Sequence, residues 1–303
     1  MMRKYSSYLI LFCLTHGALA SPWMTGALLA PNGITTKPGH FNFEPYSVYT
    51  TTPQRTSYTE APVLYLGITD VIDLETVVPY SFNWANNQRG SAHGFADMTL
   101  GFGLQAFTQK ENSWIPNLRI AVLEVFPTGK FDQLDPTKKG ADQTGIGAYQ
   151  TIFSFSFQAL RELHEQHYLR THLTLRTSVA SDVKLAGITT FGGNPMTHGK
   201  VNLGNSSSAD LALEYTLTQN WVPVFELFFV TNEAASFTGN PGLDITGAID
   251  TVGHQSGKQL SLAPALEYNF NEHVGIIAGV WFSVSGKPAD QFVASTIAIN
   301  FFY

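Results

Sequence analysis

Residues 259–270 read QLSLAPALEYNF, and apolar side chains alternate with small or polar ones along this stretch. Leu260, Leu262 and Leu266 fall on one face of an extended chain, whereas Ser261 and Glu267 fall on the other. A tilted strand of roughly 9–11 residues is long enough to cross the hydrocarbon core of a bilayer. One face of this stretch suits lipid and the other suits water, so it predicts a transmembrane β-strand.

The same alternation recurs along the chain. Segments 98–107, 169–175 and 211–217 repeat it most clearly. We expect strands at residues 41–51, 61–69, 71–83, 94–107, 117–128, 145–160, 168–182, 207–218, 221–231, 259–270, 273–284 and 291–303. The pattern predicts an all-β fold, a transmembrane antiparallel β-barrel of about twelve strands.

The connections between these strands sort by length when they are taken alternately. The short set is 69–70, 108–116, 161–167, 219–220 and 271–272. The other set is mostly longer and comprises 52–60, 84–93, 129–144, 183–206, 232–258 and 285–290. Outer-membrane barrels have tight periplasmic turns and long external loops, so we expect both termini to be periplasmic.

The first twenty residues have the features of a cleavable signal peptide. Arg3 and Lys4 form a basic start, an apolar run follows, and small residues at 18–20 suit a signal peptidase. The single cysteine, Cys13, lies in this segment, so disulfides are not expected in the mature chain. We therefore divide the chain into a signal peptide (1–20), an N-terminal segment (21–40) and a barrel (41–303).

The N-terminal segment, residues 21–40, is apolar for a chain that precedes the first strand. Trp23, Met24, Leu28 and Leu29 make it a poor free tail in water. Two positions are open to it: it enters the lumen as a plug, or it lies against the periplasmic rim.

The chain ends in an alternating run, Ile297, Ile299, Phe301 and Tyr303. A terminal aromatic residue in such a run resembles the targeting signature read by the outer-membrane assembly machinery. We therefore expect Tyr303 to contact that machinery and the barrel to sit among the lipids of the bacterial outer membrane.

Composition agrees with a barrel and argues against one class of partner. The chain is 44% hydrophobic, yet Asp and Glu (23) outnumber Lys and Arg (17), for a formal net charge of −6. Binding of nucleic acid depends on a basic face that neutralises phosphates, so we expect no nucleic acid partner.

A pair of motifs in residues 94–130 resembles a known family. Gly94, Asp97, Leu100 and Gly101 follow a G-x-x-D-x-x-L-G strand pattern, and residues 127–129 close the next strand as P-T-G. Together these resemble the outer-membrane family named for a MetA-pathway of phenol degradation, whose members are described as transporters. The resemblance implies a barrel transporter and suggests a hydrophobic or aromatic solute.

Charged residues on the inward face are the candidates for a selectivity site. The candidates are Arg170, Arg176, Glu214, Glu226, Glu267, Asp97 and Arg119. They could select a solute in passive uptake of a small molecule, or they could form ion pairs that fill a narrow barrel. Opposite charges on adjacent strands should pair, so we expect Arg170 and Arg176 to pair with Glu214.

Other classes of protein have weaker support. A structural or adhesive barrel without transport would also carry long polar loops. A lipid hydrolase is suggested only by the triplet at 254–256, where His254 and Ser256 have the spacing of a base and a nucleophile. His164 and His167 have the spacing of metal ligands but lie in a charged turn. We expect no catalytic residue, no metal and no cofactor.

One position conflicts with a lipid-facing strand. Glu124 falls on the same face as Leu118, Ile120 and Val122, where a carboxylate is costly. Either a β-bulge near Leu123 shifts the register, or Glu124 lies close enough to the interface to reach water.

The signal peptide leads to a direct prediction. The mature protein should begin at Ser21 and fractionate with the outer membrane, because the small residues at 18–20 mark the cleavage site. N-terminal sequencing of the membrane fraction checks both points. Recovery in the soluble periplasm would contradict the barrel.

Overall fold

The computed structural model describes residues 22–86, 90–110, 113–287 and 291–303, and the predicted signal peptide at 1–20 lies outside this part of the chain. Across these ranges, no helix has the length and apolar character needed to span a membrane. The regular secondary structure of the described chain is β-strand throughout, apart from one short 3₁₀ turn, η1 (Pro136–Lys138).

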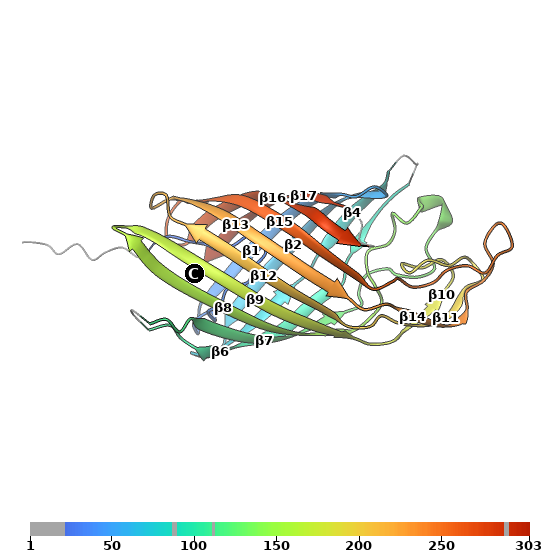
Figure 1. Ribbon diagram of the computed structural model, residues 1–303, viewed down its shortest axis with the longest axis horizontal. Helices are drawn as coiled ribbons and strands as arrows, with labels where there is room; N and C mark the ends of the chain where they lie inside the picture. Colours follow the sequence, from blue (N-terminus) through green and yellow to red (C-terminus); the bar gives the residue numbers. More distant parts are fainter. Residues whose placement is uncertain (1–21, 87–89, 111–112, 288–290) are drawn as a thin grey trace, which may run out of the picture.

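Twelve antiparallel strand positions close into a barrel (Figure 1). Ten are continuous: β1 (Phe41–Thr51), β2 (Arg55–Gly67), β7 (Asn117–Phe126), β8 (Gln150–His164), β9 (His167–Ala180), β12 (Ser206–Tyr215), β13 (Trp221–Asn232), β15 (Gly257–Asn269), β16 (Val274–Lys287) and β17 (Val293–Phe302). The other two are interrupted: β3 (Ile72–Val77) continues as β4 (Tyr80–Ala85), and β5 (Ser91–Phe95) continues as β6 (Met98–Phe107). The predicted barrel of about twelve strands is confirmed.

Closure is made by the first and last strands. β1 pairs with β2 on one side and with β17 on the other, so the sheet returns to its start. Beyond the ladder, Phe41 N donates to Tyr303 O at 2.5 Å, and Tyr303 N donates to Phe41 O at 2.9 Å. The Tyr303 ring stacks on His273, with centroids 5.2 Å apart.

The interruption of two strand positions has a local cause. Pro79 stands between β3 and β4, and it has no N–H group to donate to the ladder. Its carbonyl accepts instead from Ala96 N at 2.9 Å, which lies between β5 and β6. The two breaks therefore face each other on neighbouring strands.

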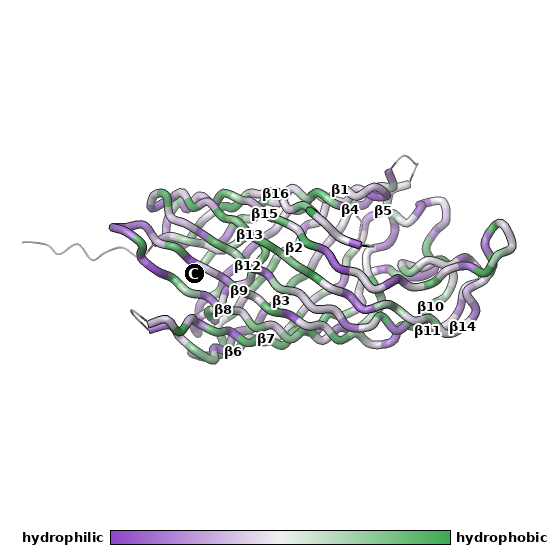
Figure 2. The backbone as a smooth tube through the Cα atoms, in the orientation of Figure 1, coloured by the Kyte–Doolittle hydropathy of each residue, from purple (hydrophilic) through white to green (hydrophobic). Residues whose placement is uncertain are grey.

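The side chains alternate as the sequence predicts. Leu173 and Leu175 on β9 point outward and are about 40% exposed, whereas His172 and Thr174 point inward and are buried. Figure 2 shows hydrophobic and hydrophilic residues alternating along the barrel strands. In a membrane the outward apolar surface would contact lipid.

The two ends of the barrel differ. The turns at one end are short, and Figure 1 places the C-terminus and the tight β8–β9 turn there. The long loops project from the other end. One length prediction is wrong: the loop expected at 52–60 is a tight turn at 52–54, in which Thr52 N donates to Arg55 O. The start of β2 was missed because residues 55–60 contain little apolar alternation.

Two long loops, predicted at 183–206 and 232–258, hold strands that the sequence did not predict. β10 (Val183–Ala186), β11 (His198–Asn202) and β14 (Ser236–Asn240) form a small antiparallel sheet beyond the barrel (Figure 1). Its apolar core draws on three separate loops. The buried members are Ala148, Val183, Leu185, Val201 and Leu203.

The register around Glu124 is regular. β7 pairs with β8 without a shift from Asn117 to Val125, so the bulge proposed near Leu123 is wrong. Glu124 does face outward, and its Oε2 accepts from Thr151 Oγ1 at 2.8 Å. It lies two residues before β7 ends at Phe126, on the long-loop side of the barrel.

The facing of β9 generates a test. Leu173→Arg should destabilise the barrel by about 2–4 kcal/mol, because it puts a guanidinium on the lipid face near the middle of the strand. Ser178→Arg on the same strand should cost less than about 1 kcal/mol, because Ser178 faces an aqueous cavity and loses one hydrogen bond. Urea unfolding in lipid vesicles measures both, and equal costs would mean that the assigned faces are wrong.

Candidate functional site

The N-terminal segment runs inside the barrel. Its first leg is held by inward-facing side chains near the short-turn end: Asn269 Nδ2 donates to Trp23 O at 2.8 Å, and Thr25 N donates to Glu267 Oε1 at 2.5 Å. Arg170 also donates to the Met24 carbonyl, at 3.1 Å.

The segment turns at the level of Glu226, in the middle of β13. The Glu226 carboxylate accepts from three consecutive amides, those of Leu28 (2.5 Å), Leu29 (3.0 Å) and Ala30 (2.9 Å). Successive N–H groups aimed at one carboxylate form an anion-binding arrangement. Glu226 is fully buried, so these amides supply the partners that burial requires.

A second leg returns to the short-turn end and leads into β1. Gly33 N donates to Gln158 at 2.8 Å, Thr35 N to Gln105 at 2.7 Å, and Thr36 N to Asp73 at 3.1 Å. Residues 23–36, which we call the luminal segment, thus form a re-entrant loop within the lumen.

Apolar packing holds one side of the luminal segment. Leu28 is 2% exposed, and it lies in a cluster with small or branched inward residues of the wall. The buried wall members are Ala212, Val222, Val224, Ala263, Ile277 and Ala298. The segment therefore packs against the β12 to β17 side of the lumen.

Arg119 anchors a buried ion-pair group on the opposite wall. Its Nη2 lies 2.7 Å from Asp73 Oδ1 and 3.0 Å from Glu75 Oε2. Gly103, on the neighbouring strand, makes room for the guanidinium, because a Cβ there would lie 2.2 Å from Arg119 Nε. The glycine in the motif region thus has a packing role.

Arg170 and Glu214 form a second buried group, as predicted. They are opposite each other on β9 and β12, Arg170 Nη2 forms an ion pair with Glu214 Oε2, and Arg170 Nε donates to Oε1 at 2.9 Å. His172 Nε2 lies 2.6 Å from the same Oε1. The group closes much of the lumen beside the first leg of the luminal segment.

Arg176 does not join this group, so the predicted pairing of Arg176 with Glu214 is wrong. The register places Arg176 opposite Ser208, six residues from Glu214 along β12. The only hydrogen bond formed by the Arg176 side chain within the described chain runs from Nε to Ser154 Oγ, at 3.4 Å.

Asp97 holds a loop at the far end of the barrel. Its carboxylate accepts from Gly129 N at 2.9 Å and from Ile146 N at 2.8 Å. Thr128 Oγ1 donates to Ala96 O at 2.7 Å, which ties the P-T-G turn to the same strand break. The two motifs therefore act together to clamp the loop that follows β7, and Asp97 contributes both of its carboxylate oxygens to this clamp.

The clamped loop, residues 127–149, covers part of the barrel mouth. Gln143 O accepts from Arg55 at 3.2 Å and from Asn83 at 3.1 Å, so the loop turns inward. Within it, burial opposes ionisation of Asp142, but the Asp135 amide and the Lys130 ammonium, 2.7 Å away, outweigh this and lower its pKa.

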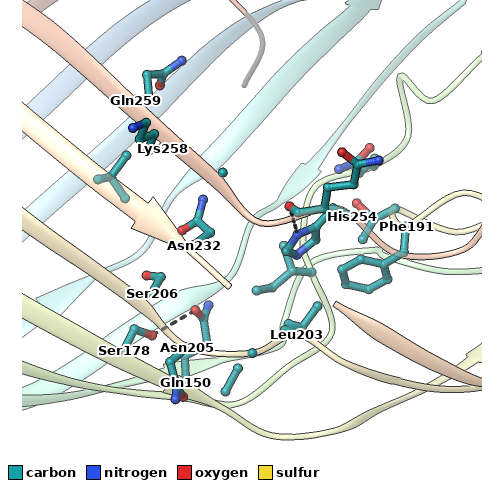
Figure 3. A pocket seen from close by; sticks show the side chains of 18 residues that line it. Gln150, Ser178, Phe191, Leu203, Asn205, Ser206, Asn232, His254, Lys258 and Gln259 are labelled. Atoms are coloured by element: carbon teal, nitrogen blue, oxygen red, sulfur yellow. Dashed lines mark hydrogen bonds between the residues drawn. The ribbon is translucent and has the colours of Figure 1, made fainter. Parts of the chain in front are cut away.

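An outer cavity of about 450 Å³ lies beneath the loops (Figure 3). Five neighbouring strands each contribute one inward polar side chain to it: Gln150, Ser178, Ser206, Asn232 and Gln259. Phe191, Leu203 and His254 line it from the loops. Its wall therefore combines uncharged polar side chains with apolar ones such as Phe191 and Leu203.

An inner cavity of about 350 Å³ lies one layer deeper, beside the turn of the luminal segment. Gln150 and Ser178 line the outer cavity, whereas Ile152 and Arg176, two residues further along the same strands, line the inner one. Three aromatic residues, Tyr46, Tyr65 and Trp281, also line the inner cavity. Its wall combines rings, aliphatic side chains and a few charges.

Two of the histidines considered as a base or as metal ligands lie beside backbone carbonyl groups. His254 Nδ1 lies 3.2 Å from the Gln255 carbonyl, and His167 Nδ1 lies 2.8 Å from Thr216 O. Among the described residues, no group of three or more His, Cys, Asp or Glu side chains is placed to hold a metal ion.

Sequence reasoning identified the charged residues but missed how several of them are used. Glu226 and Glu267 bind backbone amides of the luminal segment, as do the neutral side chains of Gln105 and Gln158. A signal in the sequence could have revealed this role. Gln105 and Gln158 face inward on otherwise apolar strands, and a buried glutamine needs a hydrogen-bond partner.

Comparison with known proteins places the fold. No family model matches the chain, and a search of curated proteins finds no similar sequence. The solved structure of the COG4313 outer membrane channel from Pseudomonas putida F1 is similar, with a TM-score of 0.68 at 14% identity over 90% of this chain and 98% of that one.

Two further solved structures are less similar. The NanC porin has a TM-score of 0.45 at 10% identity, covering 86% of this chain and 98% of its own. The TodX monoaromatic hydrocarbon channel has a TM-score of 0.39 at 12% identity, covering 88% and 90%. Likeness at these levels supports no functional argument, and the stronger match shows that this chain has the fold of an outer-membrane β-barrel.

Proposed function

We propose that this chain is a bacterial outer-membrane channel for passive uptake of a small molecule, with hydrophobic or aromatic compounds as the substrate class. The observation that carries the proposal is the stacking of two cavities along the lumen, closed toward the short-turn end by the luminal segment. A barrel that served only as a scaffold has no need for two cavities stacked in this way.

The change in lining from one cavity to the next supports a solute with an apolar part. Amides and hydroxyls alternate with apolar side chains in the lining of the outer cavity, where a solute arrives from water. The inner cavity offers Tyr46, Tyr65 and Trp281, whose rings favour contact with another ring or an alkyl group. Apolar pockets with a few placed polar groups are typical of small-molecule sites.

The luminal segment is suited to act as a plug. After the predicted cleavage, its one covalent link to the barrel would be through residues 37–40 to β1, and its contacts with the wall are hydrogen bonds and apolar packing. Displacing it would join the inner cavity to the spaces beside its two legs, which are lined by Ile34, Gln158 and Arg170. We propose that a solute passes when this segment moves aside.

A structural or adhesive barrel is the second candidate. Buried ion pairs around Arg119 and Arg170 fill much of the lumen, and the β10–β11–β14 sheet forms a compact body on the loops. Both features would suit a barrel that never opens. The two functions differ in whether the lumen conducts.

Replacing the luminal segment tests the proposal. We exchange residues 23–36 for a Gly-Ser sequence of equal length, which removes the side chains and the packing but keeps the connection to β1. Conductance per barrel in a planar bilayer should rise several-fold, because the lumen loses its main obstruction.

The control is Trp114→Ala, a change on an exposed short-turn residue away from the lumen, which should leave conductance unchanged. Heat-modifiable mobility on gels confirms that each variant is folded. A folded Gly-Ser variant that stays at background conductance would refute the channel and favour the structural barrel.

Ion selectivity gives a second test. Inward acids outnumber the inward arginines, so the wild-type pore should prefer cations. Arg176→Glu should strengthen this preference without preventing assembly, because Arg176 lines the inner cavity and does not face lipid. The measurement is the reversal potential in a potassium chloride gradient.

Lys184→Glu on β10 makes the same change in net charge outside the lumen, and it should shift the reversal potential much less. An equal shift in both variants would show that Arg176 does not border the ion path.

A further inference from the structure

Strands β7 and β9 place Arg119, Arg170 and Arg176 in the lumen, and Arg176 differs from the other two in its partners. Arg119 is bound to Asp73 and Glu75, and Arg170 is bound to Glu214. In the described ranges no carboxylate lies within 4.0 Å of the Arg176 guanidinium, and its one hydrogen bond is a long contact to Ser154. Most of the donors of Arg176 are therefore available to a ligand.

The position of Arg176 directs these donors toward the inner cavity. It lines that cavity together with Tyr46, Tyr65 and Trp281, at the layer where a solute would leave the outer cavity. A planar guanidinium with paired N–H groups matches the two oxygens of a carboxylate. The inner cavity thus offers a guanidinium to the anionic group of a ligand and aromatic rings to its apolar group.

The acids of the same cavity are already engaged by the protein. Glu44 accepts from Asn42 at 2.7 Å, from Asn300 at 2.8 Å and from Tyr46 at 3.3 Å. Glu75 is held by Arg119. Asp210, on the strand next to Arg176, attracts the guanidinium through its charge but forms no hydrogen bond or ion-pair contact with it among the described residues. The hydrogen-bond donors of Arg176 are therefore not taken up by these acids.

We propose that the inner cavity binds a small aromatic carboxylate, with Arg176 holding the carboxylate and the ring lying against Tyr46, Tyr65 and Trp281. This inference rests on the proposed function, because it requires that the lumen admits a small molecule. It adds the requirement that the solute carry a negative charge, which a channel for neutral hydrocarbons would lack. The volume of about 350 Å³ is at the small end for ligand pockets and suits a single ring.

The test compares two probes of similar size, benzoate and benzyl alcohol, by isothermal titration calorimetry on the full-length mature barrel in detergent. Wild-type protein should bind benzoate at least tenfold more tightly than benzyl alcohol. Arg176→Gln should weaken benzoate binding at least tenfold, because a charge-assisted bidentate contact is lost. Its affinity for benzyl alcohol should stay within twofold.

Two further variants complete the design. Arg176→Lys keeps the charge without the planar fork, and it should bind benzoate with intermediate affinity. Lys184→Gln removes a positive charge from the loop sheet and should bind both probes as the wild type does.

The outcomes separate the two proposals. Equal binding of benzoate and benzyl alcohol, unchanged by Arg176→Gln, would overturn the carboxylate site and leave the channel standing. Binding of neither probe, together with background conductance in the Gly-Ser variant, would overturn both. Loss of benzoate binding in Lys184→Gln as well would show that net charge alone attracts the anion, and it would also overturn the site.

Discussion

The requirement that every backbone N–H and C=O group find a partner away from water governs this structure. A sheet with an open edge would leave a row of such groups facing lipid, so the strands must close on themselves. Here β1 pairs with β17, and the Phe41 and Tyr303 backbones continue that pairing to the end of the chain. The outward apolar face and the polar interior follow from this closure.

Closure then creates a second constraint, because charged and amide side chains are buried inside a narrow lumen. Each needs a partner, and the protein supplies partners in two ways. Arg119 and Arg170 pair with acids of neighbouring strands, while Glu226 accepts from three amides of the luminal segment and Glu267 accepts from one, through Oε1. The luminal segment is therefore part of the internal hydrogen bonding of the barrel, and its displacement would expose these carboxylates.

The motifs that suggested a transporter family have a structural explanation. Asp97 and the P-T-G turn join a strand break to the loop that covers the barrel mouth, and Gly103 leaves space for Arg119. The motif residues thus specify how this barrel is covered, and Gly103, two residues beyond the first motif, specifies how its lumen is packed. The residues proposed to meet a solute, Arg176 and the three rings that line the same cavity, lie outside those motifs.

The sequence by itself determined the β-class, the number of barrel strands and the lipid-facing side of strands such as β9, because alternation with period two is a local property that residues such as Leu173 and Thr174 carry on their own. Only the tertiary structure decided that Glu214 pairs with Arg170 and not with Arg176, since pairing depends on the register between β9 and β12. It also decided that residues 23–36 lie in the lumen and that three loop strands form a sheet. Those contacts join residues far apart in sequence, such as Leu28 and Glu226, and no local pattern encodes them.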